Sequence, residues 1–331
     1  MFAEPTEMKR IVVEVHRSNH AGSIAFSASS TAGSGPQPGR TGRVRSPEIY
    51  STRTRIKTVR FSCSLLLTAA LSALAPPASA ESKAALTIRV NPQGFGASKA
   101  DIHAVCRSAG DQLLKHMDGL EKTTVVVSKG KHGPIALFDR GRKGEFHVKL
   151  DTGQTYWSQY SYQFAHEICH VLCRYEDDYK GNLWFEETLC ELASLYCLRE
   201  MSRTWRTNPP YANWKAFAPS LRDYTDDILR KRVDYLEILK SGLPAYYRKH
   251  AAHLVKNATD REKNGSMAVV LLALFERQPE HWNAIRWVNA APSPEGETFA
   301  QYLTKWRDAV PEKHKQFVES IAGMYGVTLK P

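Results

Sequence analysis

The chain has 331 residues, of which 42% are hydrophobic and 24% charged, so it holds enough apolar material for a sizeable globular core. The formal net charge is +11, but residues 1–80 carry ten Lys/Arg and only four Asp/Glu. Residues 81–331 are left with 35 basic and 30 acidic residues, a net charge of +5. A surface so mixed gives no strong electrostatic reason to bind nucleic acid.

Residues 46–80 have the three parts of a secretory signal peptide. A basic patch at 53–60 precedes an uncharged apolar run at 61–75, and the segment ends in Ala78-Ser79-Ala80. The apolar run is shorter than the roughly 20 residues that a membrane-spanning helix needs. We therefore expect cleavage after Ala80 and a secreted or periplasmic mature chain without membrane contact. An uncleaved membrane anchor is the alternative.

Residues 1–45 do not fit in front of a signal peptide. They are rich in Ser, Gly, Pro and Arg and show no sustained hydrophobic periodicity. Such a composition is typical of disordered chain. We expect either a disordered extension or a wrongly assigned translation start.

The first part of the mature chain, residues 81–200, mixes strands with helices. Four segments alternate in polarity or are rich in β-branched residues, as strands are: 86–90, 123–127, 135–138 and 145–150. The apolar residues of 98–117 recur at helical spacing instead. The basic turn between the last two strands predicts a hairpin.

From Thr155 onward the hydrophobic pattern has the period of an α-helix. Phe164, Ile168 and Leu172 recur every four residues, and a second helix is predicted at about 184–201. Residues 201–331 are mostly helical with breaks at prolines, and the apolar run 267–275 is too short to span a membrane. The predicted fold class is α+β, with a small mixed sheet upstream of a helix pair and a mainly helical C-terminal lobe.

Residues 166–170 read His-Glu-Ile-Cys-His and lie on the first of these helices. Positions i and i+4 share one helix face, so the imidazoles of His166 and His170 can reach one metal ion. Glu167 flanks that face, where its carboxylate can accept a proton from a metal-bound water. A pentapeptide of this kind also arises by chance in a small fraction of chains, so its context matters.

The second helix supplies carboxylates at a suitable distance. Zinc in a catalytic site takes three protein ligands and keeps one position for water. Glu187 lies 17 residues beyond His170, which allows the rest of one helix, a loop and the start of a packed neighbour. Glu191 is one turn further on the same face, where it can accept a hydrogen bond from the far nitrogen of a ligating histidine.

This pattern resembles the gluzincins, the thermolysin-like and aminopeptidase-like zinc metallopeptidases. The resemblance covers residues 145–200 and rests on the His-Glu-x-x-His motif, the downstream Glu187-x-x-x-Glu191 and the stretch Trp184-Phe-Glu-Glu. It implies a zincin-like fold, Zn²⁺ held by His166, His170 and Glu187, and Glu167 as general base. Glu191 would replace an Asp that supports a ligating histidine.

The register of the third ligand has an alternative. Glu186 stands where the aminopeptidase-type stretch has Asn, and the gap to the third ligand is slightly shorter than in the best-known members. We favour Glu187 over Glu186, because the residue one turn after Glu187 is a carboxylate and the one after Glu186 is Cys190.

The resemblance implies an exported zinc peptidase that acts on a peptide or protein substrate. The strand at 145–150 would pair with an extended substrate, and a side chain of the helical lobe would stabilise the oxyanion; candidates are Tyr211, Tyr224, Tyr246 and Tyr247. Two other classes stay open: an inactive binding or scaffold protein on a zincin fold, and a helical structural protein with a chance motif. Oligomeric state is not predicted.

Five cysteines follow the predicted signal: Cys106, Cys169, Cys173, Cys190 and Cys197. An odd number predicts at least one free thiol. A Cys/His zinc site built on Cys169 and Cys173 is the alternative metal site. We expect small buried residues or a disulfide instead, with Cys173–Cys190 as the candidate pair.

Overall fold

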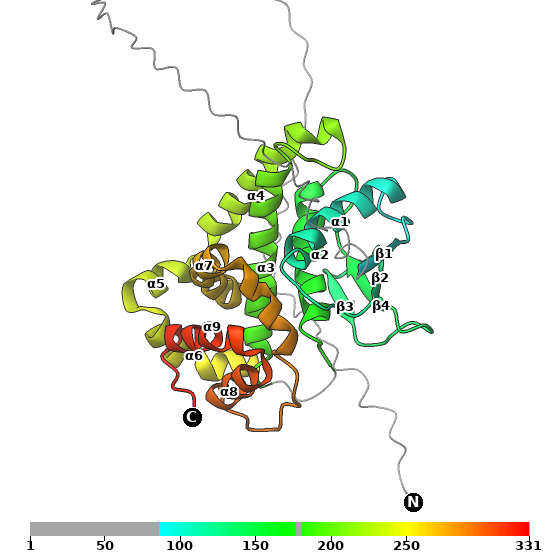
Figure 1. The fold of residues 1–331 in the computed structure, drawn as a ribbon. Helices are drawn as coiled ribbons and strands as arrows, with labels where there is room; N and C mark the ends of the chain where they lie inside the picture. Colours follow the sequence, from blue (N-terminus) through cyan, green and yellow to red (C-terminus); the bar gives the residue numbers. More distant parts are fainter. Residues whose placement is uncertain (1–85, 177–180, 331) are drawn as a thin grey trace, which may run out of the picture. The chain divides into compact units, whose positions relative to one another are not determined.

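A computed structural model describes residues 86–176 and 181–330 (Figure 1). The predicted extension 1–45 and signal peptide 46–80 lie outside these residues. All the described residues belong to one compact unit.

The sheet has four strands in the order β1-β2-β4-β3. They are β1 (Leu86–Val90), β2 (Thr123–Lys129), β3 (Ile135–Leu137) and β4 (Phe146–Leu150). β1, β2 and β4 are mutually parallel, whereas β3 is antiparallel to β4. The four predicted strands and the hairpin are confirmed, and the sheet is mixed.

The expectation that the strand at 145–150 pairs with substrate is wrong. β4 bonds to β2 on one side and to β3 on the other, so it has no open edge. β3 follows β2 in the chain but lies at the outer edge of the sheet, and the β3–β4 hairpin then places β4 between β2 and β3. The outer strand at this side of the sheet is β3.

Two helices cover the sheet on the side of the predicted motif. α1 (Lys99–Leu114) connects β1 to β2, and its first turn is capped by Ser98, whose Oγ accepts from the Asp101 backbone N–H at 3.0 Å. α2 (Trp157–Leu172) packs on α1, β3 and β4. α2 carries the His-Glu-x-x-His motif, which therefore lies on a helix as predicted.

The centre of the described part is α3 (Leu183–Thr204), a 22-residue helix that contacts α1, α2, α4 and α7. It is buried on most of its circumference, as a helix with neighbours on several sides is. Figure 1 shows α3 between the sheet and the C-terminal helices. The expectation of a second helix at 184–201 is confirmed.

The C-terminal lobe is helical, as predicted. Its elements are η2 (Ala212–Phe217), α4 (Ala218–Lys231), α5 (Asp234–Ser241), α6 (Leu243–Lys256), α7 (Arg261–Arg277), η3 (Pro279–Trp287), α8 (Phe299–Ala309) and α9 (Glu312–Met324). The apolar run 267–275 lies inside α7. Among the described helices, none combines the length and the apolar character needed to cross a bilayer.

Aromatic packing fixes the start of α3 against this lobe. The Trp184 ring stacks on Tyr247 of α6, with 5.4 Å between centroids, and lies 4.6 Å from Phe299 of α8. Phe185 packs on Phe299 at 5.1 Å. Each such pair adds about 0.5–1.5 kcal/mol beyond area burial. The next two residues of α3, both glutamates, are thereby held towards α2.

Candidate metal centre

Helices α2 and α3 lie antiparallel, and their facing surfaces bring the predicted site residues together. The end of α2 faces the start of α3, so His170 lies against Glu186 and Glu187. One turn earlier on α2, His166 lies against Glu187 and Glu191. This arrangement follows from the amphipathic α2 and the short connection to α3.

The carboxylate of Glu187 faces both imidazoles. Its Oε2 is 3.2 Å from His166 Nε2, and its Oε1 is 3.6 Å from His170 Nε2. Ligands bound at the usual zinc distances of about 2.0–2.1 Å in a tetrahedron lie about 3.3–3.4 Å apart. Both distances are close to this spacing, with a different oxygen of Glu187 facing each ring. The Glu187 side chain is 15% exposed, so one side of the cluster opens towards solvent.

Cys190 is the other candidate for the third donor. Nitrogens of His166 and His170 and the sulfur of Cys190 all fall within 4.8 Å of one another. Cys190 is fully buried, whereas the cluster opens at Glu187. We favour Glu187 as the third donor because its oxygens already lie at ligand–ligand spacing and leave the open side for water.

Glu186 takes the other nitrogen of His170. Its Oε1 is 2.6 Å from His170 Nδ1, the ring atom that does not face Glu187. A carboxylate at this position fixes the orientation and tautomer of the ring. The two glutamates of the register alternative therefore take different places: the Glu187 carboxylate faces the Nε2 atoms of both rings, and the Glu186 carboxylate faces Nδ1 of His170.

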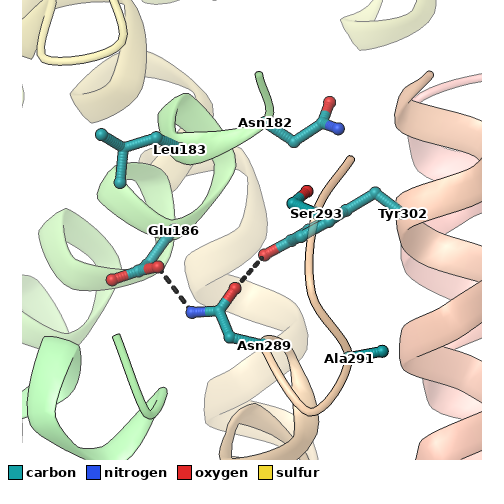
Figure 2. Close-up of a pocket in the computed structure, with 7 residues that line it drawn as sticks. All are labelled: Asn182, Leu183, Glu186, Asn289, Ala291, Ser293 and Tyr302. Carbon is teal, nitrogen blue, oxygen red and sulfur yellow. Dashed lines mark hydrogen bonds between the residues drawn. The ribbon is translucent and has the colours of Figure 1, made fainter. Parts of the chain in front are cut away.

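Glu186 is itself held by the C-terminal lobe. Asn289 Nδ2 donates to Glu186 Oε2 at 2.6 Å and to the backbone oxygen of Cys173 at 3.1 Å. Tyr302 of α8 donates to Asn289 Oδ1 at 3.0 Å. Figure 2 shows Asn289 between Glu186 and Tyr302 in a small pocket. A continuous chain of hydrogen bonds therefore runs from α8 to His170.

Glu191 faces His166 without bonding to it. The distance from Glu191 Oε1 to His166 Nδ1 is 4.0 Å, longer than a hydrogen bond. The partners of Glu191 are Tyr162, whose hydroxyl donates to Oε2, and Arg232, whose Nη2 lies 3.0 Å from the same atom. The expected direct bond to a histidine is absent from this structure.

Glu167 is almost fully buried, with 3% of its surface exposed. Burial raises the pKa of its carboxyl, although the rings of His166 and His170 and the Ala136 backbone N–H of β3 act in the opposite direction. A raised pKa makes this carboxylate a stronger base than the carboxylate of an exposed glutamate.

The charges around the cluster are unbalanced. Burial alone would lower the pKa of His170, but the carboxylates of Glu187, Glu186 and Glu167 outweigh it and raise the pKa to about 10. Burial would likewise raise the pKa of Glu187, but the His170 and His166 rings lower it. Three carboxylates thus surround two imidazoles in a mostly buried place. The protonated His170 ring balances part of this negative charge, and a bound divalent cation would balance it in place of that proton.

All five described cysteines are free thiols and buried. The proposed Cys173–Cys190 disulfide is therefore not present in this structure. Cys169 instead lies with its sulfur 4.0 Å from that of Cys173 and 3.7 Å from the backbone oxygen of Leu189. These thiols fill the contact between α2 and α3.

One of the four candidate tyrosines lies beside the cluster. Tyr224 of α4 packs edge-on against Tyr162, with 6.2 Å between centroids, and the charge of Glu191 is one cause of its raised pKa, after burial. The other three pack on residues outside the cluster: Tyr211 on Trp214, Tyr246 on Asp234 and Tyr247 on Trp184.

Sequence reasoning missed four supporting residues: Tyr162, Arg232, Asn289 and Tyr302. Tyr162 lies four residues before His166, so helical spacing places it on the same face and could have identified it. The other three approach from the C-terminal lobe and leave no local signal in the sequence.

Comparison with known proteins found no protein-family model, no curated protein and no solved structure that matches this chain.

Proposed function

We propose that the chain is a zinc-dependent metallohydrolase, and specifically a peptidase. The observation that carries the proposal is the position of the Glu187 carboxylate, whose two oxygens lie 3.2 and 3.6 Å from the Nε2 atoms of His166 and His170. The helix pair beside a small mixed sheet with an antiparallel outer strand supports a zincin-like fold. For its setting we propose export, on the basis of the segment 46–80.

Each group of the cluster has a separate task in this proposal. His166, His170 and Glu187 would hold the zinc, which would supply a Lewis acid. Glu167 would accept a proton from the attacking water and pass it to the leaving amine. Glu186 orients the His170 ring through its Nδ1. Of the four tyrosines, we propose Tyr224 as the residue that supports the oxyanion.

A peptide substrate is favoured by the sheet. β3 is the outer strand, and its Ala136 N–H faces Glu167. An extended peptide that adds to this edge would pass beside the general base. β3 thus takes the place that the sequence had suggested for β4.

The proposal is tested by metal analysis and activity of three proteins. Wild type is expected to bind one zinc per chain and to cleave a generic peptide library. Glu167→Gln should retain the zinc and lose activity by about 10²–10⁴-fold, whereas Glu187→Gln should lose the zinc as well. Wild type without zinc affinity, or equal activity in wild type and Glu167→Gln, would contradict it. Zinc binding without any peptidase activity would leave the second candidate, a zinc-bound scaffold protein.

A further inference from the structure

Arg140 extends from the turn of the β3–β4 hairpin and packs on two aromatic rings. Its guanidinium carbon lies 3.5 Å from the centroid of the Phe146 ring and 4.9 Å from that of the Tyr175 ring. Its Nη1 donates to the Tyr175 hydroxyl at 3.0 Å. Arginine stacks readily on aromatic faces, and these contacts hold its planar head group in one orientation.

The turn that carries Arg140 is closed by hydrogen bonds. The Gly141 N–H donates to the Glu145 carbonyl oxygen at 2.8 Å, and the Gly144 N–H donates to the Gly141 carbonyl oxygen at 2.9 Å. The carboxylate of Glu145 pairs with Arg89 of β1, at 3.2 Å. The backbone beside Arg140 is therefore fixed, and the glutamate of this turn is already paired with another arginine.

Arg140 lacks an acidic partner among the residues that the structure describes. It is partly buried, and the acceptor of its hydrogen bond there is the Tyr175 hydroxyl. The other described arginines pair with a carboxylate, donate to carbonyl oxygens as Arg286 does, or are exposed. A partly desolvated guanidinium is stabilised by an anion, and its planar fork of N–H donors matches a carboxylate. An anionic ligand is therefore the partner that this position lacks.

Tyr175 connects this arginine to the metal centre. The centroid of its ring lies 6.2 Å from that of the His170 ring, and its hydroxyl donates to the Leu137 carbonyl oxygen at the end of β3. The distances from the Tyr175 ring to Arg140 and to His170 limit the separation of these two residues to about three residues of an extended peptide, at roughly 3.3 Å each. A peptide added to the edge of β3 would therefore pass within reach of Arg140.

We propose that Arg140 determines specificity by binding a carboxylate of the peptide substrate close to the scissile bond. The inference rests on the proposed function and adds the chemical class of its substrate. The carboxylate belongs to an acidic side chain or to the free C-terminus, up to about three residues from the bond that is cleaved. Both sources present the same planar group with two oxygens, which a guanidinium binds through two parallel hydrogen bonds.

Cleavage of N-acetylated, alanine-rich octapeptides tests the inference. One set carries a single glutamate at successive positions, a second carries glutamine there, and every peptide is made with a free and with an amidated C-terminus. For at least one acidic peptide the kcat/KM of wild type should exceed that of its uncharged counterpart by about tenfold or more. The pair that shows this ratio distinguishes an acidic side chain from the C-terminal carboxylate.

Variants of the hairpin turn identify the residue responsible. Arg140→Gln should abolish the ratio, and Arg140→Lys should keep part of it, because lysine retains the charge without the planar fork. Arg142→Gln removes an exposed arginine of the same turn and should leave the ratio as in wild type. The ratio compares two peptides on one protein, so a smaller folded fraction does not change it.

Calorimetry with the same peptides separates this inference from the proposed function. Glu167→Gln should bind the peptides without cleaving them, so its affinities and those of Glu167→Gln/Arg140→Gln measure recognition alone. If acidic peptides bind more tightly through Arg140 but wild type cleaves none, the proposed function fails and the carboxylate site stands. Cleavage by wild type without preference for a carboxylate, or with a preference that Arg140→Gln retains, would overturn the inference and keep the peptidase. Neither binding nor cleavage of any peptide would overturn both.

Discussion

Asn289 reaches Glu186 across 103 residues of sequence and donates to its Oε2 at 2.6 Å. The other oxygen of Glu186 lies 2.6 Å from His170 Nδ1. A residue of the C-terminal lobe therefore positions a proposed metal ligand through a single intervening carboxylate.

Replacing Asn289 by alanine should weaken zinc binding. Loss of a group that orients a ligand through hydrogen bonds typically costs 10- to 100-fold in metal affinity, so we expect a change of about that size. Competition with a coloured zinc chelator measures it. Asn213→Ala, at an exposed position of η2, serves as the matched control. Equal affinities of the two variants would show that Asn289 does not position His170.

The third donor can be identified by a pair of alanine variants. We expect Glu187→Ala to lose stoichiometric zinc and Cys190→Ala to keep it, because the Glu187 oxygens already lie at ligand spacing from both rings. Equilibrium dialysis followed by metal analysis gives the stoichiometry. The reverse pattern would assign the site to two histidines and a thiolate.

Arg232 should be important for stability. Its guanidinium is 11% exposed and pairs with Glu191, whose side chain is 3% exposed. In Arg232→Met the buried Glu191 loses its positive partner, so we expect the free energy of unfolding to fall by about 3–5 kcal/mol. Urea unfolding measures this change. Lys231→Met removes the neighbouring exposed cation and should cost less than about 1 kcal/mol; a similar cost for both would refute the assignment.

The buried His314 should make stability depend on pH. Burial lowers its pKa to about 4, with further lowering by His281 and Lys313 and opposing effects of Asp118 and Glu280. The ordinary value is 6.5, so between these two values the unfolded chain binds a proton that the folded chain does not. The free energy of unfolding should therefore decrease as the pH falls from 6.5 towards 4, and this contribution ends below that range.

The contribution of His314 is isolated by substitution. His314→Asn should reduce the slope of unfolding free energy against pH within that window, while His103→Asn, at an exposed position of α1, should leave the slope as in wild type. Urea unfolding at several pH values between about 7 and 4 provides the slopes. An unchanged slope in His314→Asn would show that other groups set the acid sensitivity.

The elements could be predicted because their signals are local. Alternation along 86–90 and the four-residue recurrence of Phe164, Ile168 and Leu172 depend only on neighbouring residues. The order of the strands could not be predicted in the same way. β4 pairs with β2 rather than only with its hairpin partner, and such pairing depends on contacts between distant segments.

The residues of the candidate site also differ in whether their signal in the sequence is local. His166 and His170 follow from helical spacing, and Glu187 follows from two helices joined by a short connection. The supporting residues depend on tertiary packing. Arg232 lies 41 residues from Glu191 along the chain, and Asn289 lies 103 residues from Glu186. The hydrogen bond that we expected from Glu191 to a histidine is made by Glu186, whose carboxylate lies at Nδ1 of His170. Glu191 instead pairs with Arg232.

The distance along the chain between Glu186 and Asn289 also has a consequence for biosynthesis. The α2–α3 hairpin can close as soon as residue 204 has been made, since its partners are neighbours in sequence. The bond from Asn289 forms only after most of the C-terminal lobe has been translated and has docked. We therefore expect a nascent polypeptide to hold the proposed zinc ion weakly and to gain its full affinity only at the last stage of folding.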